Sequence, residues 1–256
     1  MGFTYMMCGS WNTQGVIGKV PRFFMPSNEH QKSQLKRRQR VADHGEVFTN
    51  PREVNAMLDL VRDESFRLDS RFLEPACGDG NFLIEILRRK LSLLSSVKSQ
   101  TEWEFQSLIA VGSCYGIDIL PDNAEACRKR LLDYVISQHH GSVDADNPYY
   151  KSLVYMLHCN IVCGDALTYR TLDNRPITFS EWTPIAGSMQ FARRDFQFDF
   201  LVTQSHQYSL FDEQGEAQHF DEPVKSYPPV HYTQLFKAQS ELKEQKERSD
   251  SSFGSD

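Results

Sequence analysis

The sequence predicts a mixed α/β fold in which a mostly parallel sheet is flanked by helices. The chain has 256 residues, which suits one domain with a substantial core. Its 40% hydrophobic and 24% charged content exclude wholesale disorder, a collagen or a small disulfide scaffold. Short apolar runs also alternate with amphipathic stretches, as in successive strand–helix units.

The first predicted unit lies in residues 51–97. A helix is expected over residues 51–62, because Pro51 suits a first helical turn and apolar residues follow at helical spacing. Phe72-Leu73 is a short apolar run ending in Glu74-Pro75, which predicts a buried strand. A second helix is predicted over residues 81–97.

The same pattern then repeats along the chain. Residues 108–119 contain a second apolar strand, and residues 123–137 have the spacing of a helix with one apolar side. Residues 160–163 predict a third strand, and residues 198–203 (FDFLVT) predict a fourth. Residues 171–195 between them are predicted to be a long connection.

Composition divides the chain into three parts. Residues 1–40 form an irregular N-terminal segment with a basic end. The basic run QKSQLKRRQRV covers residues 31–41, and it suits either a solvated face or a segment that contacts phosphates. Residues 41–240 carry the alternating pattern. Residues 241–256 have almost no apolar side chains, so a disordered tail is expected there.

Charge and cysteine content narrow the class of protein further. The net charge of −6 argues against a generally basic nucleic-acid coat protein, but leaves room for a local basic groove. The six cysteines contain no Cys-x-x-Cys pair, so reduced thiols in a cytoplasmic protein are expected rather than a metal site. No signal-peptide pattern and no run of 18 apolar residues is present, so no membrane segment is predicted.

The segment EPACGDGNF, residues 74–82, falls between a predicted strand and a predicted helix. Gly78 and Gly80 permit a tight turn and the close approach of a ligand to the N-terminus of the helix. The third glycine of the dinucleotide fingerprint is absent. Asp79 either caps the helix or contacts a cofactor.

Two acids occupy the corresponding places after the next two strands. Asp118 is well placed to bind the hydroxyls of a ribose, and Asp165 to accept a hydrogen bond from the exocyclic amine of adenine. Each acid has an ordinary alternative, as a turn former or a helix cap. Together with the glycine turn, they outline a nucleoside pocket at the carboxyl end of an open sheet.

In combination, these segments resemble the N6-adenine DNA methyltransferases of bacterial restriction–modification systems. The segment HGEVFTNP, residues 44–51, is similar to the family's first motif, which closes over the methionine end of S-adenosylmethionine. Residues 74–82 resemble the main cofactor loop. The resemblance runs from about Val41 to Gln239, and it implies a Rossmann-like S-adenosylmethionine-dependent methyltransferase fold that acts on double-stranded DNA.

The resemblance also implies the cofactor contacts. Asp118 matches the acid that binds the ribose, Ile119 the residue that packs on adenine, and Asp165 the acid that reads the adenine amine. The full set of implied cofactor-binding residues is Phe48, Thr49, Glu74, Ala76, Gly78, Gly80, Asp118, Ile119, Asp165 and Ala166.

The sequence departs from the family at the catalytic centre. Where the family has Asn-Pro-Pro-Tyr, this chain has Ser205-His206-Gln207-Tyr208. In the family, the Asn side chain and the first Pro carbonyl accept hydrogen bonds from the target amine, and the Tyr stacks on the flipped base. Ser205 and Tyr208 are therefore the catalytic candidates, but the shorter side chain and the lost prolines weaken the positioning that this catalysis needs. His206 has no identified orienting partner for a general base.

The second departure concerns the C-terminal part. About fifty residues follow the loop after the fourth predicted strand, where the family has three more strands and a target-recognition region. The C-terminal strands are therefore expected to be missing and an edge of the sheet to be exposed, unless a second subunit completes it. Tyr227-Pro228-Pro229 is expected to precede a helix over residues 230–239.

Three functions remain open from the sequence. The first is an adenine-N6 DNA methyltransferase, or its cofactor-binding part, that needs no metal. The second is a catalytically inactive relative that binds S-adenosylmethionine or a partner subunit. The third is an interaction protein that keeps only the fold; a Rossmann dehydrogenase is a weaker rival because the third glycine is missing.

Overall fold

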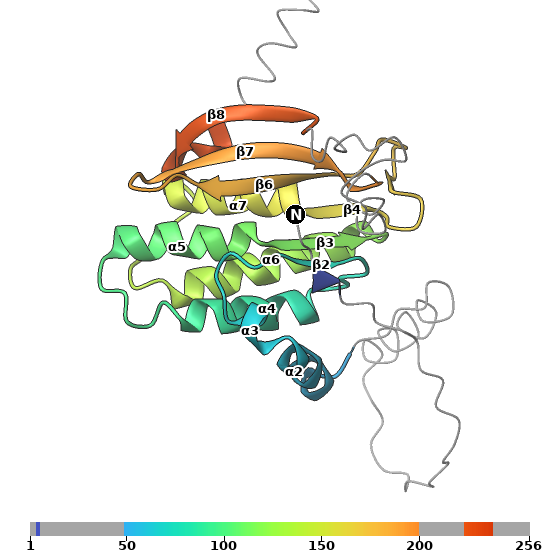
Figure 1. The fold of residues 1–256 in the computed structure, drawn as a ribbon, viewed down its shortest axis with the longest axis horizontal. Helices are drawn as coiled ribbons and strands as arrows, with labels where there is room; N and C mark the ends of the chain where they lie inside the picture. Colours follow the sequence, from blue (N-terminus) through green and yellow to red (C-terminus); the bar gives the residue numbers. More distant parts are fainter. Residues whose placement is uncertain (1–3, 6–48, 200–222, 238–256) are drawn as a thin grey trace, which may run out of the picture.

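The computed structural model describes residues 4–5, 49–199 and 223–237 (Figure 1). It confirms a mixed α/β protein with a mostly parallel sheet and flanking helices. The elements in chain order are β1 (Thr4–Tyr5), α2 (Pro51–Leu60), α3 (Arg62–Ser65), β2 (Phe72–Glu74), α4 (Asn81–Ser92), α5 (Gln100–Gly112), β3 (Cys114–Asp118), α6 (Pro121–Gln138), α7 (Pro148–Asn160), β4 (Ile161–Asp165), β5 (Arg170–Thr171), β6 (Thr178–Pro184), β7 (Gln190–Gln197), β8 (Lys225–His231) and the 3₁₀-helix η1 (Tyr232–Lys237).

The first sheet has the strand order β1-β2-β3-β4-β5. Strands β1 to β4 run parallel, and β5 pairs antiparallel with the end of β4. The register sets Glu74 opposite Gly116, and Asp118 opposite Cys163. The carboxyl ends of β2, β3 and β4 therefore lie side by side.

The helices predicted at residues 51–62, 81–97 and 123–137 are confirmed as α2, α4 and α6, although α4 ends at Ser92. The predicted second strand is too long, because residues 108–112 belong to α5. Ser99 begins α5 by accepting a hydrogen bond from the backbone N–H of Glu102. A buried apolar run cannot distinguish a helix from a strand, which explains the error.

Helix α7 was not predicted. Asn147 caps it by accepting from the backbone N–H of Tyr149 at 2.8 Å, and Pro148 occupies the first turn. The helix ends at Asn160, so the third strand begins one residue later than predicted. Its buried side chains include Tyr149, Leu153 and Met156.

The C-terminal part corrects three predictions. The long connection expected at residues 171–195 contains β6 and β7, which form an antiparallel hairpin. Strand β8 pairs with β7, so Tyr227-Pro228-Pro229 lies in a strand. Of the helix predicted over residues 230–239, the described residues show the 3₁₀-helix η1, which begins at Tyr232 after the end of β8. Residues 198–199 are helical instead of beginning the fourth strand, and residues 200–203 lie outside the described residues.

The second sheet packs on one face of the first. Leu73, Tyr115 and Ile117 of the parallel strands form an apolar cluster with Phe179 of β6 and Phe196 of β7. The Tyr115 hydroxyl donates to the Ser180 carbonyl at 3.1 Å across this contact. C-terminal strands are therefore present, and they stack on the face of the parallel sheet instead of extending its edge (Figure 1).

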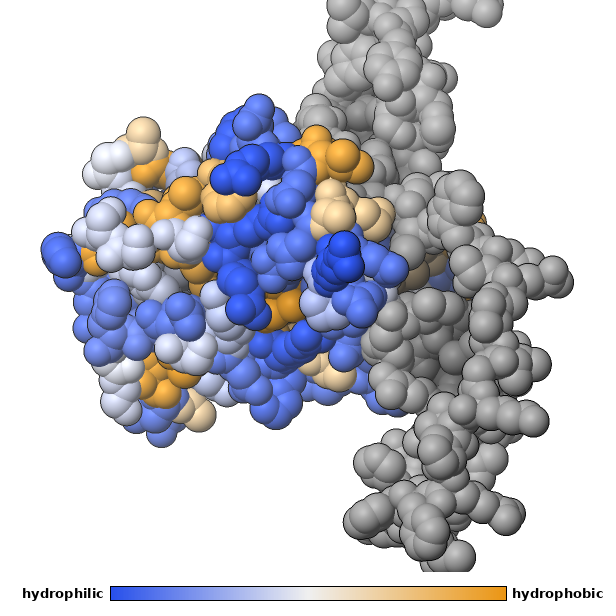
Figure 2. All heavy atoms as spheres, turned by 90° about the horizontal axis from the view of Figure 1, so that it is seen from below, coloured by the Kyte–Doolittle hydropathy of each residue, from blue (hydrophilic) through white to orange (hydrophobic). Residues whose placement is uncertain are grey.

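Helices cover the opposite face of the parallel sheet. Gly116 of β3 approaches α4 so closely that an added Cβ would lie 3.0 Å from Leu83 Cδ1. The outer surface on the side of α2 and α4 is largely hydrophilic, with small separate apolar patches (Figure 2). Among the helices that the structure describes, none is long and apolar enough to span a membrane.

Candidate functional site at the strand ends

The turn between β2 and α4 has two glycines in left-handed conformations, Gly78 with φ +53° and Gly80 with φ +90°. An added Cβ on Gly80 would lie 2.8 Å from Cys127 Sγ, whereas one on Gly78 would meet no atom within 4 Å. The Cys77 N–H donates to the Ile117 carbonyl at 2.8 Å. The turn is therefore anchored on its Gly80 side and open at Gly78.

Asp118 joins this turn to the end of β3. Its Oδ2 accepts from the Gly78 N–H at 2.8 Å, and its Oδ1 accepts from the Leu120 N–H at 2.8 Å and from Asn123 Nδ2 at 3.2 Å. The residue is only 8% exposed. A carboxylate has about four acceptor positions, so about one remains for a ligand hydroxyl.

Asp165 ends β4, the strand beside β3. Its Oδ1 accepts from the Leu167 N–H at 2.8 Å, which forms a local turn. Ala166 follows half-buried, whereas Leu167 is 89% exposed. Ile119, directly after Asp118, is 46% exposed, so each acid has an exposed apolar side chain close to it in the chain.

Glu74 ends β2 and is only 4% exposed. Burial raises the pKa of its carboxyl to about 8, against the opposing effect of a hydrogen bond from the backbone of Ala76. Ala76 thus contacts Glu74 within the turn.

The thiols behind the turn are not activated. A hydrogen bond with Cys127, together with burial, raises the pKa of the Cys77 thiol well above its ordinary value. All five cysteines in the described residues are free thiols. No group of three His, Cys, Asp or Glu side chains in the described ranges could hold a metal ion.

Sequence reasoning missed three residues that support the turn: Cys127, Asn123 and Arg130. Arg130 of α6 forms an ion pair with Asp79 at 3.3 Å and donates to Asn81 Oδ1 at 2.7 Å. Gly80, and not Asp79, is the residue directly before α4, so Asp79 does not occupy the cap position of this helix. Its carboxylate forms the ion pair with Arg130 instead. In the sequence, only the spacing of Asn123, five residues after Asp118, could have indicated that it supports the turn.

The structure brings eight of the predicted residues together at the ends of β2, β3 and β4. This strand-end site consists of Glu74, Ala76, Gly78, Gly80, Asp118, Ile119, Asp165 and Ala166. Thr49 lies before Asn50, the residue that caps α2. Phe48, Ser205 and Tyr208 lie outside the described residues.

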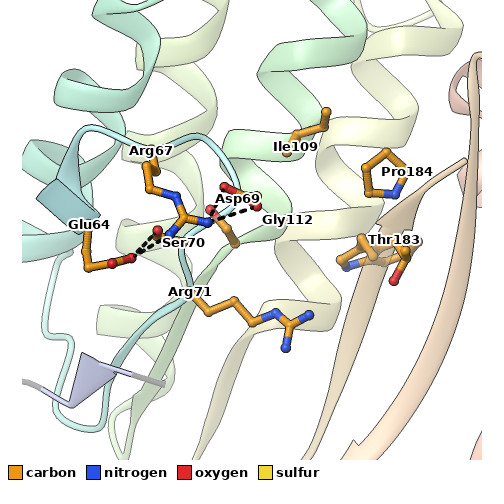
Figure 3. A pocket seen from close by; sticks show the side chains of 11 residues that line it. Glu64, Arg67, Asp69, Ser70, Arg71, Ile109, Gly112, Thr183 and Pro184 are labelled. Atoms are coloured by element: carbon orange, nitrogen blue, oxygen red, sulfur yellow. Dashed lines mark hydrogen bonds and ion pairs between the residues drawn. The ribbon is translucent and has the colours of Figure 1, made fainter. Parts of the chain in front are cut away.

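A separate cavity of about 330 Å³ lies at the opposite, amino end of the strands (Figure 3). Arg67 pairs there with Glu64 at 3.5 Å and with Asp69 at 3.4 Å, and Arg71 pairs with Glu181. The charged groups lining it thus already have partners in the protein. We place the candidate site at the strand ends because the open glycine turn and the two acids meet there.

Comparisons with known proteins yield no relative. No family model, no curated protein and no solved structure matches the chain.

Proposed function

We propose that the chain binds S-adenosylmethionine at the strand-end site, as the cofactor-binding part of an adenine-N6 DNA methyltransferase with a Rossmann-like fold. The observation that carries this proposal is the hydrogen bond from the Gly78 N–H to Asp118, which joins the open turn to the next strand. Ligands of open α/β sheets bind at the carboxyl ends of the strands, which is where this bond lies.

The chemistry of the neighbouring side chains suits a nucleoside. Ile119 and Leu167 offer exposed apolar surface for the two faces of a base, and Asp165 offers a carboxylate for its amine. Asp118 retains about one acceptor position for a ribose hydroxyl. The space beside Gly78 lets the remainder of the ligand approach the backbone.

The methyl-transfer step rests on the sequence resemblance. The bound cofactor supplies an electrophilic methyl group on a sulfonium. Ser205 would accept a hydrogen bond from the target amine, and Tyr208 would stack on a base flipped from double-stranded DNA. A second subunit would supply target recognition.

Calorimetric titration of the purified chain with S-adenosylmethionine tests the cofactor proposal. We expect saturable one-to-one binding that is weakened at least about tenfold in Asp118→Ala and in Asp165→Asn, because each loses an acceptor. Asp146→Ala is the matched control, since that side chain is 99% exposed on a distant loop. Absence of binding by a folded chain contradicts the proposal.

A catalytically inactive relative that binds S-adenosylmethionine or a partner subunit is the second candidate. It is favoured by Ser205-His206-Gln207 in place of Asn-Pro-Pro, and by the helical residues 198–199 where the strand was expected. Transfer of a radiolabelled methyl group to unmethylated DNA separates the two. Activity of the unaltered chain rejects the second candidate, whereas activity only after Asn-Pro-Pro is restored supports it.

A further inference from the structure

Protein groups already occupy most of the acceptor positions on the Asp118 carboxylate. Its Oδ2 accepts from the Gly78 N–H at 2.8 Å. Its Oδ1 accepts from the Leu120 N–H at 2.8 Å and also from Asn123 Nδ2 at 3.2 Å. Each carboxylate oxygen has two lone pairs, so Oδ1 is saturated and Oδ2 retains one acceptor position. The carboxylate therefore has room for one further donor, whereas a ribose offers two hydroxyls.

The second bond to Oδ1 comes from the side chain of Asn123. This residue lies in the first turn of α6 and is only 6% exposed. Its backbone N–H donates to the Leu120 carbonyl at 3.1 Å, which fixes its position at the start of the helix. An ionised carboxylate only accepts hydrogen bonds, so the nitrogen and not the oxygen of the Asn123 amide faces Asp118. The bond from Leu120 belongs to the backbone turn after β3, so Asn123 is the side chain that fills the remaining position on Oδ1.

We infer that Asn123 is a specificity-determining residue of the strand-end site. By leaving Asp118 a single acceptor position, it makes the site bind a nucleoside through one ribose hydroxyl and tolerate the loss of the other. This inference rests on the proposed function and deepens it, because it names the sugars that the site accepts: ribose and one of the two monodeoxyriboses.

The free acceptor position belongs to Oδ2, the oxygen that is bonded to the open turn. An added Cβ on Gly78, whose N–H donates to the same oxygen, would meet no atom within 4 Å. A hydroxyl that donates to Oδ2 makes a hydrogen bond to a charged group, which is stronger than one between neutral groups. The other hydroxyl finds no position on Asp118, so its loss removes no hydrogen bond to this carboxylate.

Titration calorimetry of the purified chain with three ligands tests this inference. The probes are S-adenosylhomocysteine, which carries the nucleoside without a reactive methyl group, and its 2′-deoxy and 3′-deoxy counterparts. We expect one deoxy ligand to bind at least about tenfold more weakly than S-adenosylhomocysteine, because it lacks the hydroxyl that donates to the charged acceptor. The other deoxy ligand should bind within about threefold of S-adenosylhomocysteine.

The Asn123→Ala variant tests the role of the side chain. It frees one acceptor position on Oδ1, so the second hydroxyl gains a partner and its loss should now weaken binding about tenfold as well. A merely structural role of Asn123 would weaken all three ligands alike and leave the ratios of their affinities unchanged. Lys129→Ala on the same helix is the matched control, since its side chain is 71% exposed, and it should keep the ratios of the unaltered chain.

The outcomes separate this inference from the proposed function. Comparable weakening for both deoxy ligands in the unaltered chain, or for neither, overturns the inference, and this comparison needs no variant if Asn123→Ala fails to fold. Unchanged affinity ratios in a folded Asn123→Ala chain overturn the assignment to Asn123. Binding of none of the three ligands by the folded, unaltered chain contradicts the proposed function, and the inference with it.

Discussion

Glycines with the same backbone conformation have different roles in this chain. Gly80 and Gly187 both have positive φ, +90° and +73°. An added Cβ on Gly80 would meet Cys127 Sγ at 2.8 Å, whereas one on Gly187 would meet nothing within 4 Å. Gly80 is therefore needed for close packing of the turn on α6, and Gly187 only for the conformation of the β6–β7 turn.

We predict that Gly80→Ala lowers the free energy of unfolding by about 2–4 kcal/mol, from left-handed strain plus overpacking. Gly187→Ala should cost only about 1–2 kcal/mol, from strain. Urea denaturation followed by circular dichroism measures both. The Cys127→Ala substitution should recover part of the loss in Gly80→Ala. Equal losses in the two glycine variants would exclude the Cys127 contact as the cause.

At the scale of elements, Arg193 connects the second sheet to the helices. It donates to Asp195 Oδ1 and Oδ2 at 2.8 and 2.9 Å within β7. Its guanidinium lies 4.4 Å from the ring centre of Tyr227 in β8, 5.5 Å from that of Trp182 in β6 and 5.4 Å from that of Tyr155 in α7. One side chain therefore contacts three strands and a helix.

We predict that Arg193→Ala costs about 3–5 kcal/mol of folding stability, because Asp195 is 8% exposed and loses its charged partner. Arg194→Ala is the control from the same strand. Its side chain is 42% exposed, and its partner Glu181 keeps the ion pair with Arg71, so we expect a loss below about 1 kcal/mol. Thermal unfolding of the two variants compares them, and similar melting temperatures would contradict this role.

At the scale of the whole molecule, Glu74 makes folding stability depend on pH. Its pKa is raised from 4.5 to about 8, so the folded chain favours the neutral carboxyl. The stability that this preference contributes is fully present below about pH 4.5 and is lost as the pH rises to about 8. A shift of this size corresponds to roughly 3–5 kcal/mol.

We therefore predict that Glu74→Gln becomes progressively more stable than the unaltered chain between pH 5 and pH 8.5. The other titrating groups are common to both proteins and cancel in the difference. Melting temperatures across this range, in the absence of ligand, measure the effect. A constant difference would show that Glu74 titrates normally in the folded chain.

Local sequence patterns were sufficient for much of the first part of the chain. Proline at the start of α2, the glycines of the turn and the apolar spacing of α6 act through neighbours within a few residues, so they are visible in the sequence. Helix α7 has the same kind of signal in the sequence, an Asn-Pro start.

The second sheet and the details of the strand-end site depend on residues far apart in the chain. Strand β7 carries charged residues, so an alternation of apolar and polar side chains is hard to recognise in its sequence. Its partner strands are β6 and β8. The bond from Gly78 to Asp118 spans 40 positions and exists because β2 and β3 pair in parallel with a particular register. The acids and the glycines can be recognised in the sequence, but their distances and their burial arise from packing between distant segments.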